Sequence, residues 1–184
     1  MSELRKTYAG GLFYLTFTVV GWADVFTRKI YTDELVKNLI YCQANKDLEI
    51  YAYVVMTNHL HMIVARKDEQ LLSDWIRDFK SYTAKQFLKL ILENPQESRK
   101  EWLEMIFRYH GKGTKQNKDF AFWQKDSHPI PLWSAEVIKQ KENYIHQNPV
   151  RAGFVAEPQD WILSSASPYS PIKVLDCCNN GKMP

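Results

Sequence analysis

The pattern of apolar positions predicts three β-strands in the first part of the chain. Residues 12–20 are rich in β-branched and aromatic side chains and stop at Gly21, which is typical of a strand. Residues 48–56 and 59–65 form two further apolar runs on either side of Thr57-Asn58. We expect two antiparallel strands there, joined by a turn, because the two runs together would be long for a single strand.

Apolar side chains three to four residues apart predict two helices that alternate with these strands. The first begins near Thr32, an expected N-cap, and ends near Asn45. The second covers residues 72–91, carries basic side chains on its outer sides and is ended by Asn94-Pro95.

Residues 94–119 are predicted to be an insertion between the long helix and the last strand. A helix is expected over 97–110, with Trp102, Ile106 and Tyr109 in phase, and a polar, basic stretch follows it.

The last strand and the last helix come after this interval. Residues 120–125 and 130–133 can supply the strand, although the prolines at 129 and 131 make it irregular or place it at a sheet edge. Ser134 is an expected N-cap for a helix over 135–147. That helix should end before Pro149, because the residue preceding a proline is pushed out of the α region.

This order of elements, β-α-β-β-α-β with one more helix after the last strand, predicts an α+β fold. It fits a ferredoxin-like (RRM-like) antiparallel sheet with helices packed on one face, and the C-terminal helix is an addition to it. We expect a single domain over residues 1–184, with a tail that is loop-like from about residue 150. A ligand would lie on the open face of such a sheet.

Composition narrows the class of protein only slightly. Hydrophobic residues make up 45% of the chain and aromatic residues 14%, which excludes a disordered chain, and the net charge of +3 is a weak indication of a polyanionic partner. Cys42 and the pair Cys177-Cys178 lack the spacing of a zinc site and are interpreted as reduced thiols. No apolar run approaches the length of a membrane span. We therefore expect a cytoplasmic protein with no membrane partner.

The clearest candidate chemistry lies in the third predicted strand. His59 and His61 flank Leu60, and alternate residues of a strand point to the same side. Their Cα atoms would lie roughly 6.5–7 Å apart, so both imidazoles can reach one metal ion while Leu60 packs in the core. A His-x-His sequence without further motifs is more often one hydrogen-bonded and one exposed histidine at a sheet edge, so a second motif is needed.

The last predicted helix supplies a second group of polar side chains. Ile138 and Ile145 mark the line of this helix that faces the core. Tyr144 and Asn148 lie about 40° apart on one flank of that line, and Lys141 is on the same flank. A phenol and an amide are thus one turn apart, although an isolated tyrosine in this position would usually be a boundary residue with its hydroxyl in water.

Both stretches resemble motifs of one family. Residues 57–64 are similar to the His-hydrophobe-His motif of the HUH single-strand endonucleases, and residues 144–155 resemble the tyrosine motif of their single-tyrosine transposases. The resemblance is closest to the REP-associated tyrosine transposase branch. Further similar stretches are 79–83, 132–134 and 161–166 together with Tyr169. The resemblance runs from about Gly10 to Tyr169 and omits the 94–119 interval and the last fifteen residues.

The resemblance implies a metal-dependent transposase and endonuclease that cleaves and rejoins single-stranded or hairpin-bearing DNA. Tyr144 would be the nucleophile, forming a 5′-phosphotyrosine and freeing a 3′ hydroxyl. His59 and His61 would hold a divalent cation, Mg²⁺ or Mn²⁺. The third ligand in the family is a polar residue one turn after the tyrosine, which here is Asn148, with Gln147 as the alternative.

Other residues are candidates for contacts with DNA. They are Arg77, Lys80, Lys85, Lys141 and Arg151 for phosphates, and Trp161 for stacking on unpaired bases. Each is also explained as an ordinary solvated or core residue. His146 lies two residues from Tyr144, about 160° away around the helix, and is therefore not expected to accept its proton.

Three other classes of protein remain compatible with the sequence. The first is a relaxase or replication-initiator nickase on the same scaffold, against which the short chain and the lack of a helicase or multi-tyrosine motif weigh. The second is a non-catalytic nucleic-acid-binding module, and the third is a metal hydrolase that uses the two histidines alone. A homodimer also stays open, because single-tyrosine transposases are often dimers, whereas a monomer is the alternative for the REP-associated branch.

Overall fold

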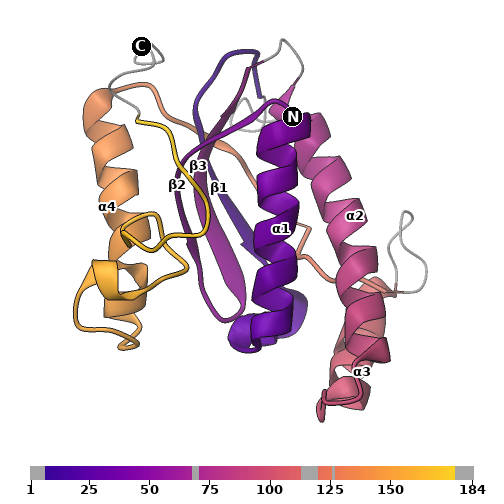
Figure 1. Ribbon diagram of the computed structural model, residues 1–184. Helices are drawn as coiled ribbons and strands as arrows, with labels where there is room; N and C mark the ends of the chain where they lie inside the picture. The colour runs from indigo at the N-terminus through magenta and orange to yellow at the C-terminus, as the bar shows by residue number, and fades with distance from the viewer. Residues whose placement is uncertain (1–6, 68–70, 113–119, 126, 177–184) are drawn as a thin grey trace.

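The computed structural model describes residues 7–67, 71–112, 120–125 and 127–176, and its centre is one four-stranded sheet (Figure 1). The strands are β1 (Phe13–Thr18), β2 (Leu48–Val55), β3 (His59–Arg66) and β4 (Ile130–Pro131). They lie in the order β2-β3-β1-β4, and each neighbouring pair is antiparallel. This topology is the ferredoxin-like arrangement that the order of elements predicted.

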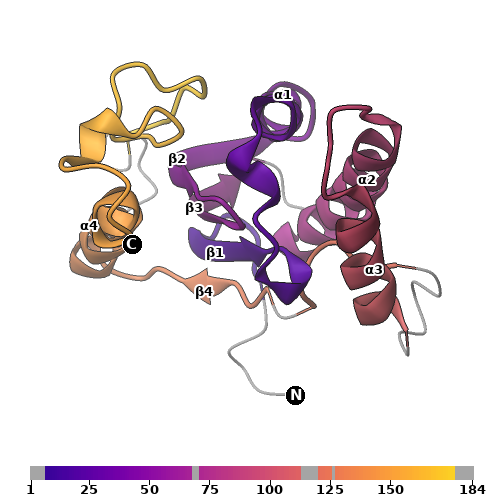
Figure 2. The ribbon, with the colours of Figure 1, turned by 90° about the horizontal axis from the view of Figure 1, so that it is seen from below.

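Helices cover both faces of the sheet. They are α1 (Lys29–Asn45), α2 (Leu72–Glu93), α3 (Lys100–Gly111) and α4 (Ala135–Arg151), with short 3-10 turns η2 (Val20–Trp22), η3 (Val25–Thr27) and η4 (Pro158–Asp160). Seen from below, α1, α2 and α3 lie on one side of the sheet and α4 lies on the other (Figure 2). The face left open by the ferredoxin-like helices is therefore covered in part by α4.

The alternation of side chains along β1 divides the interior into two cores. Phe13, Leu15 and Phe17 belong to the larger core under α1, α2 and α3. Tyr14 belongs to a smaller core, which Ile138 and Ile145 of α4 complete. The predicted core-facing line of the last helix is thus confirmed, and any residue of β1 or β3 in phase with Tyr14 faces α4.

The helix α1 begins earlier than the sequence suggested. Its N-cap is Arg28, which makes no side-chain capping bond, and Thr32 lies inside the first turns, where its hydroxyl donates to the carbonyl of Lys29. The predicted N-cap at Thr32 was therefore wrong. Tyr31 explains the difference, because its side chain is fully buried and donates a hydrogen bond to Glu97, which holds this turn against the core.

The helix α3 is present, but its predicted phase was wrong for two of the three residues. Its buried side chains are Leu103 and Phe107, and Ile106 is partly buried against the larger core, whereas Trp102 is 46% exposed and Tyr109 is 71% exposed. The ring of Phe107 packs against Phe122, with centroids 5.2 Å apart, so contact with a distant segment decides the phase. This helix is an integral part of the larger core, and residues 113–119 of the predicted insertion lie outside the described residues.

The last helix continues beyond Pro149 to Arg151, so its predicted end was also wrong. The helix ends in a Schellman motif: the N–H of Gly153 donates to the carbonyl of Val150, and the N–H of Phe154 donates to that of Pro149. Gly153 has the left-handed φ of 75° that this motif requires. The proline lies in the last turns of the helix and has no N–H to donate to the carbonyl of Ile145. At the other end, the Ser134 hydroxyl accepts from the N–H of Val137, as predicted.

The last strand lies at a sheet edge, as predicted, but it is shorter than predicted, and the tail is loop-like. β4 is a two-residue edge strand, and residues 120–125 contribute only the single bridge between Val19 and Trp123. The C-terminal tail runs beside β2, where the N–H of Val55 donates to Leu163 and the N–H of Leu175 donates to Ile50. These bonds cover an edge of the sheet that would otherwise be open.

Two findings bear on the predictions made from composition. Cys42 is buried and free, while Cys177 and Cys178 lie outside the described residues. Among the residues that the structure describes, no helix has the length and apolar character needed to cross a membrane.

Candidate active site

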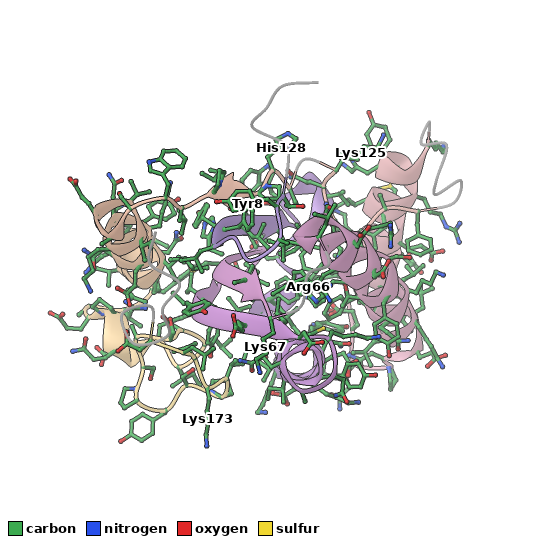
Figure 3. All side chains as sticks on the ribbon, turned by 90° about the horizontal axis from the view of Figure 1, so that it is seen from above. Tyr8, Arg66, Lys67, Lys125, His128 and Lys173 are labelled. Atoms are coloured by element: carbon green, nitrogen blue, oxygen red, sulfur yellow. The ribbon has the colours of Figure 1, made fainter. Side chains whose placement is uncertain are left out.

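The two histidines lie side by side at the start of β3, on the face covered by α4. Their ring centroids are 4.8 Å apart, and the planes meet at 70°. Leu60 between them is fully buried in the larger core. β3 runs from His59 to Arg66, and Arg66 is labelled in the view from above (Figure 3). The strand alternation predicted from the sequence therefore places both imidazoles together, as expected.

Two hydroxyl groups of β1 hold His61. Its Nδ1 atom lies 2.7 Å from the hydroxyl of Tyr14 and 2.8 Å from that of Thr16. Thr16 pairs directly with His61 in the antiparallel register, which explains the contact. Both hydroxyls contact Nδ1, so Nε2 is the ring nitrogen of His61 that remains available to bind a ligand in the site. Partners of this kind fix the orientation of a metal-binding imidazole.

Sequence reasoning missed Tyr14 and Thr16. A signal for them exists, because they are the polar-tipped positions of a strand whose alternate positions, Phe13, Leu15 and Phe17, are apolar. The sequence did not show that this strand pairs with β3 in the register that brings Thr16 to His61.

Burial keeps the imidazole of His61 and the phenol of Tyr14 neutral. It lowers the pKa of His61 to about 3, with further lowering by His59 and Lys141. Burial likewise raises the pKa of Tyr14 to about 12, so this phenol keeps its proton. A neutral imidazole has a free lone pair and is the form that binds a metal ion.

Asn58 sets the protonation of His59. Its amide Nδ2 donates to the carbonyl of Trp22 and to Asp24 Oδ1, both at 3.1 Å, so its Oδ1 is the atom that faces His59. His59 Nδ1 lies 2.7 Å from that oxygen. Because an amide oxygen only accepts, Nδ1 carries the proton and Nε2 keeps its lone pair.

Asn148 approaches the same imidazole from α4. Burial lowers the pKa of His59, and a hydrogen bond from the side chain of Asn148 acts in the opposite direction and raises it. Asn148 is thus the amide of α4 whose side chain acts on His59; Gln147, one position earlier, is half-buried as Asn148 is.

Tyr144 lies directly beside this group, in the same chain. Its ring centroid is 5.4 Å from that of His61 and 6.2 Å from that of Tyr14, and its side chain is 37% exposed. Ile145, the next residue, is fully buried and anchors this turn of α4 against the sheet. A reactive phenol that is reachable from solvent thus borders the histidine pair.

Two cationic side chains flank Tyr144. The ammonium of Lys141 lies 4.8 Å from the ring centroid of Tyr14 and 5.9 Å from that of Tyr144. The guanidinium carbon of Arg151 lies 5.5 Å from the ring centroid of Tyr144. Of the six residues predicted to contact DNA, these two lie next to the tyrosine.

Three of the predicted DNA contacts lie on α2, on the other side of the sheet (Figure 2). They are the exposed residues Arg77 and Lys85 and the half-buried Lys80. Arg77 pairs with Asp74 and Asp78 on its own helix. The ammonium of Lys80 donates to the carbonyl of Gln124, 2.6 Å away, and so holds the segment before β4. Their contacts with DNA stay predictions.

Trp161, the sixth predicted DNA contact, and His146, which was not expected to accept the proton of Tyr144, both have contacts within the protein. Trp161 donates from Nε1 to the carbonyl of Val55, and its ring stacks on Phe154 with centroids 5.4 Å apart. His146 lies 2.9 Å from the hydroxyl of Ser165 in the tail. This places His146 on another side of α4 from the histidine pair, in agreement with its angle around the helix.

The donor set of the site fits a divalent cation. Among the described residues, no group of three or more His, Cys, Asp and Glu side chains could hold a metal ion. The site instead offers the imidazoles of His59 and His61 and, beside His59, the carboxamide of Asn148. Nitrogen and oxygen donors of this kind suit Mn²⁺ well and Mg²⁺ less well.

A family model matches over half of the chain. It is described as "Transposase IS200 like" and matches residues 15–110, an interval that contains α1, β2, β3 and α2 and most of β1 and α3. No curated protein matches the chain.

Two solved structures are similar to the chain. The first is described as "Structure of the REP associates tyrosine transposase bound to a REP hairpin"; it is 24% identical, covers 90% of this chain and 82% of its own, and has a TM-score of 0.56. The second is the crystal structure of a putative transposase from Deinococcus radiodurans R1, which is 14% identical, covers 74% of this chain and 88% of its own, and has a TM-score of 0.43. The first comparison shows a shared fold.

Proposed function

The chain belongs to the IS200-like transposase family, and from this premise we propose that it cleaves and rejoins single-stranded or hairpin-bearing DNA through a covalent phosphotyrosine. One observation carries the proposal. Tyr144, His59, His61 and Asn148, which come from α4 and β3, form one group on one face of the sheet within a single chain. A nucleophile, a pair of neutral imidazoles and an amide oxygen are the parts that the reaction needs.

In the proposed reaction Tyr144 is the nucleophile. Its hydroxyl oxygen forms a bond to the phosphorus, the bond to the 3′ oxygen breaks, and the phenolic proton is balanced by the proton that the 3′ oxygen gains. The 5′ side of the DNA is then bound to Tyr144 as a phosphodiester. The bond energy is conserved, so a 3′ hydroxyl can attack the phosphotyrosine and rejoin a strand without ATP.

The cations beside Tyr144 have an electrostatic role in this proposal. Lys141 and Arg151 lie within 6 Å of the tyrosine ring and place positive charge where a phenolate and a phosphate would meet. Fixed charges that face developing negative charge lower the barrier more than charges that must reorient. Tyr14 stays protonated and holds His61, and is therefore a positioning residue.

A divalent cation, Mg²⁺ or Mn²⁺, is the cofactor that we propose. His59, His61 and Asn148 would hold it, and Asn58 and Thr16 would orient the two imidazoles. When bound, such a cation acts as a Lewis acid on a phosphoryl oxygen.

The proposed partner is DNA with an unpaired segment. The solved relative with the shared fold is a transposase bound to a REP hairpin, and this supports a hairpin substrate here. All four residues of the proposed centre come from one chain, so the reaction does not require a tyrosine from a second subunit. A homodimer is compatible with the proposal but not needed for it.

The proposal is tested by covalent capture. Purified protein is incubated with Mn²⁺ and a labelled pool of single-stranded and hairpin DNAs with randomised loops and flanks, and the products are separated on a denaturing gel. We expect label at the mass of the protein, its loss in Tyr144→Phe, and retention of DNA binding by that variant on a native gel. Removal of one hydroxyl leaves the ring contacts of Tyr144 in place, so Tyr144→Phe is a matched variant.

Other outcomes distinguish the alternatives. Retarded DNA on a native gel without any covalent product would indicate a non-catalytic binding module. Cleavage that persists in Tyr144→Phe would place the nucleophile elsewhere. A covalent product that never transfers to an added strand with a free 3′ hydroxyl would indicate a nickase.

A further inference from the structure

Trp22 is an exposed tryptophan at the edge of the candidate active site. Its side chain is 62% exposed. Its ring centroid lies 6.4 Å from that of His59, with the planes at 74°. The indole therefore touches the first histidine edge-on, and much of the ring is open to solvent.

The backbone at Trp22 is strained. Its φ is 54°, in the left-handed region that residues other than glycine, asparagine and aspartate rarely adopt. Two hydrogen bonds hold it there: its N–H donates to the carbonyl of Val19, and its carbonyl accepts from the amide of Asn58, both at 3.1 Å. Strain of this kind persists only where the surrounding structure enforces it, and it gathers at functional sites.

The turn that carries Trp22 is packed on both sides. Val20 is buried in the larger core, and Gly21 has a φ of 63°. A Cβ atom on Gly21 would lie 2.9 Å from Cγ2 of Ile106, so α3 packs directly against this turn. The turn is thus fixed between α3 and the β2–β3 connection, and the indole is exposed on a rigid support.

Asn58 links this support to the histidine pair. One side of its amide donates to the carbonyl of Trp22, and the other accepts from Nδ1 of His59. One side chain therefore sets both the position of the indole and the orientation of the imidazole. A group stacked on Trp22 and a phosphate facing His59 would be held at a fixed spacing.

We infer that Trp22 is a stacking platform for an unpaired nucleobase of the DNA strand whose phosphate faces the histidine pair. This inference rests on the proposed function and adds a specific contact to it. An aromatic face accepts any base, and a base in the interior of a duplex has no free face to offer. Trp22 thereby selects unpaired over paired DNA beside the scissile phosphate.

The test measures equilibrium binding, in Tyr144→Phe protein so that no covalent product forms. The probes are a labelled single-stranded oligonucleotide of mixed sequence and an abasic oligonucleotide of equal length, each followed by fluorescence anisotropy. We expect Trp22→Ala to weaken binding of the base-bearing probe roughly 5- to 100-fold and to leave the abasic probe unchanged. Trp22→Phe should keep most of the affinity, and Trp22→Leu, which is apolar but not planar, should not.

The matched control is Trp102→Ala, which removes another exposed indole, on α3. It should bind both probes as the parent does, and thermal unfolding checks that each variant is folded. Equal weakening of both probes by Trp22→Ala, or no weakening of either, would overturn the stacking role. So would recovery of full affinity by Trp22→Leu.

Failure of this inference can be separated from failure of the proposed function. If Trp22→Ala leaves affinity unchanged while wild-type protein still forms the covalent product, only the stacking role is lost. If the base-dependent effect is found but no covalent product forms with any DNA, the stacking role stands and the strand-transfer chemistry does not.

Discussion

The side chain of Asn148, one helical turn after Tyr144 on α4, approaches the imidazole of His59 on β3 and raises its pKa against the lowering by burial. This contact joins the two motifs that are 85 residues apart in the sequence, from His59 to Tyr144. It supports Asn148 rather than Gln147 as the third group of the proposed cation site. The two amides are neighbours on one helix, which makes them a matched pair for a test.

The first prediction concerns this pair. Asn148→Ala should weaken Mn²⁺ binding to the DNA-free protein by at least roughly tenfold, because the change removes a donor oxygen. Gln147→Ala should leave the Mn²⁺ affinity unchanged. Isothermal titration calorimetry measures both, and His59→Ala combined with His61→Ala serves as the variant without imidazole donors. Weakened Mn²⁺ binding in Gln147→Ala but not in Asn148→Ala would make Gln147 the ligand. An unchanged Mn²⁺ affinity in the double histidine variant would contradict a metal site at these residues.

The second prediction concerns the side of the molecule that DNA follows. Lys141 and Arg151 flank Tyr144, whereas Arg77 lies on the opposite side of the sheet and is already paired with Asp74 and Asp78. For single-stranded DNA, a plot of the logarithm of the binding constant against the logarithm of the salt concentration has a negative slope. The magnitude of this slope should fall by about 0.7 for each phosphate contact removed. Lys141→Ala and Arg151→Ala should each show this loss.

Arg77→Ala is the control for this measurement, and its slope should equal that of the wild type. Lys85→Ala, on the same helix, should behave likewise. If either α2 variant lowers the slope as much as Lys141→Ala does, DNA also contacts the α2 face, and the predicted contacts of Arg77 and Lys85 gain support.

The third prediction concerns pH and the buried carboxylate of Glu97. The side chain of Glu97 is fully buried, with Arg28 Nε 2.9 Å and Arg99 Nε 3.0 Å from its oxygens. Burial alone would raise the pKa of Glu97, but the hydrogen bonds from Arg99 and Tyr31 together lower it to about 2. The charged form is therefore stabilised by folding.

The sign follows from this lowered pKa. The contribution of Glu97 to the free energy of unfolding is complete above the ordinary carboxyl pKa and is lost as pH falls from about 4.5 to 2. The size of the shift corresponds to about 3 kcal/mol. Urea unfolding at a series of pH values should show this loss in wild-type protein and not in Glu97→Gln, which should be less stable near neutral pH.

Glu93→Gln is the matched control, because the Glu93 side chain is 66% exposed at the end of α2. Its stability should follow the wild-type curve over the whole pH range. An acid-induced loss in Glu97→Gln as large as that of the wild type would assign the loss to other carboxyl groups.

Much of this arrangement could be predicted from local periodicity. A strand has a period of two residues, so His59 and His61 had to share a face, and a helix has a period near 3.6, so Tyr144 and Asn148 had to share a flank. The same regularity identified Ile138 and Ile145 as the buried line of the last helix, and the order of elements indicated the ferredoxin-like topology. Each of these conclusions depends only on the periodicity within one element or on the order of the elements along the chain.

The rest depended on contacts between distant segments. The register of β1 against β3 brings Tyr14 and Thr16 to His61, and packing of Phe107 on Phe122 sets the phase of α3. The left-handed backbone of Trp22 is likewise held by Asn58, which follows it by 36 residues. Local preference favours neither these pairings nor this backbone, because their stabilisation comes from burial and hydrogen bonds that form only when the whole chain has folded.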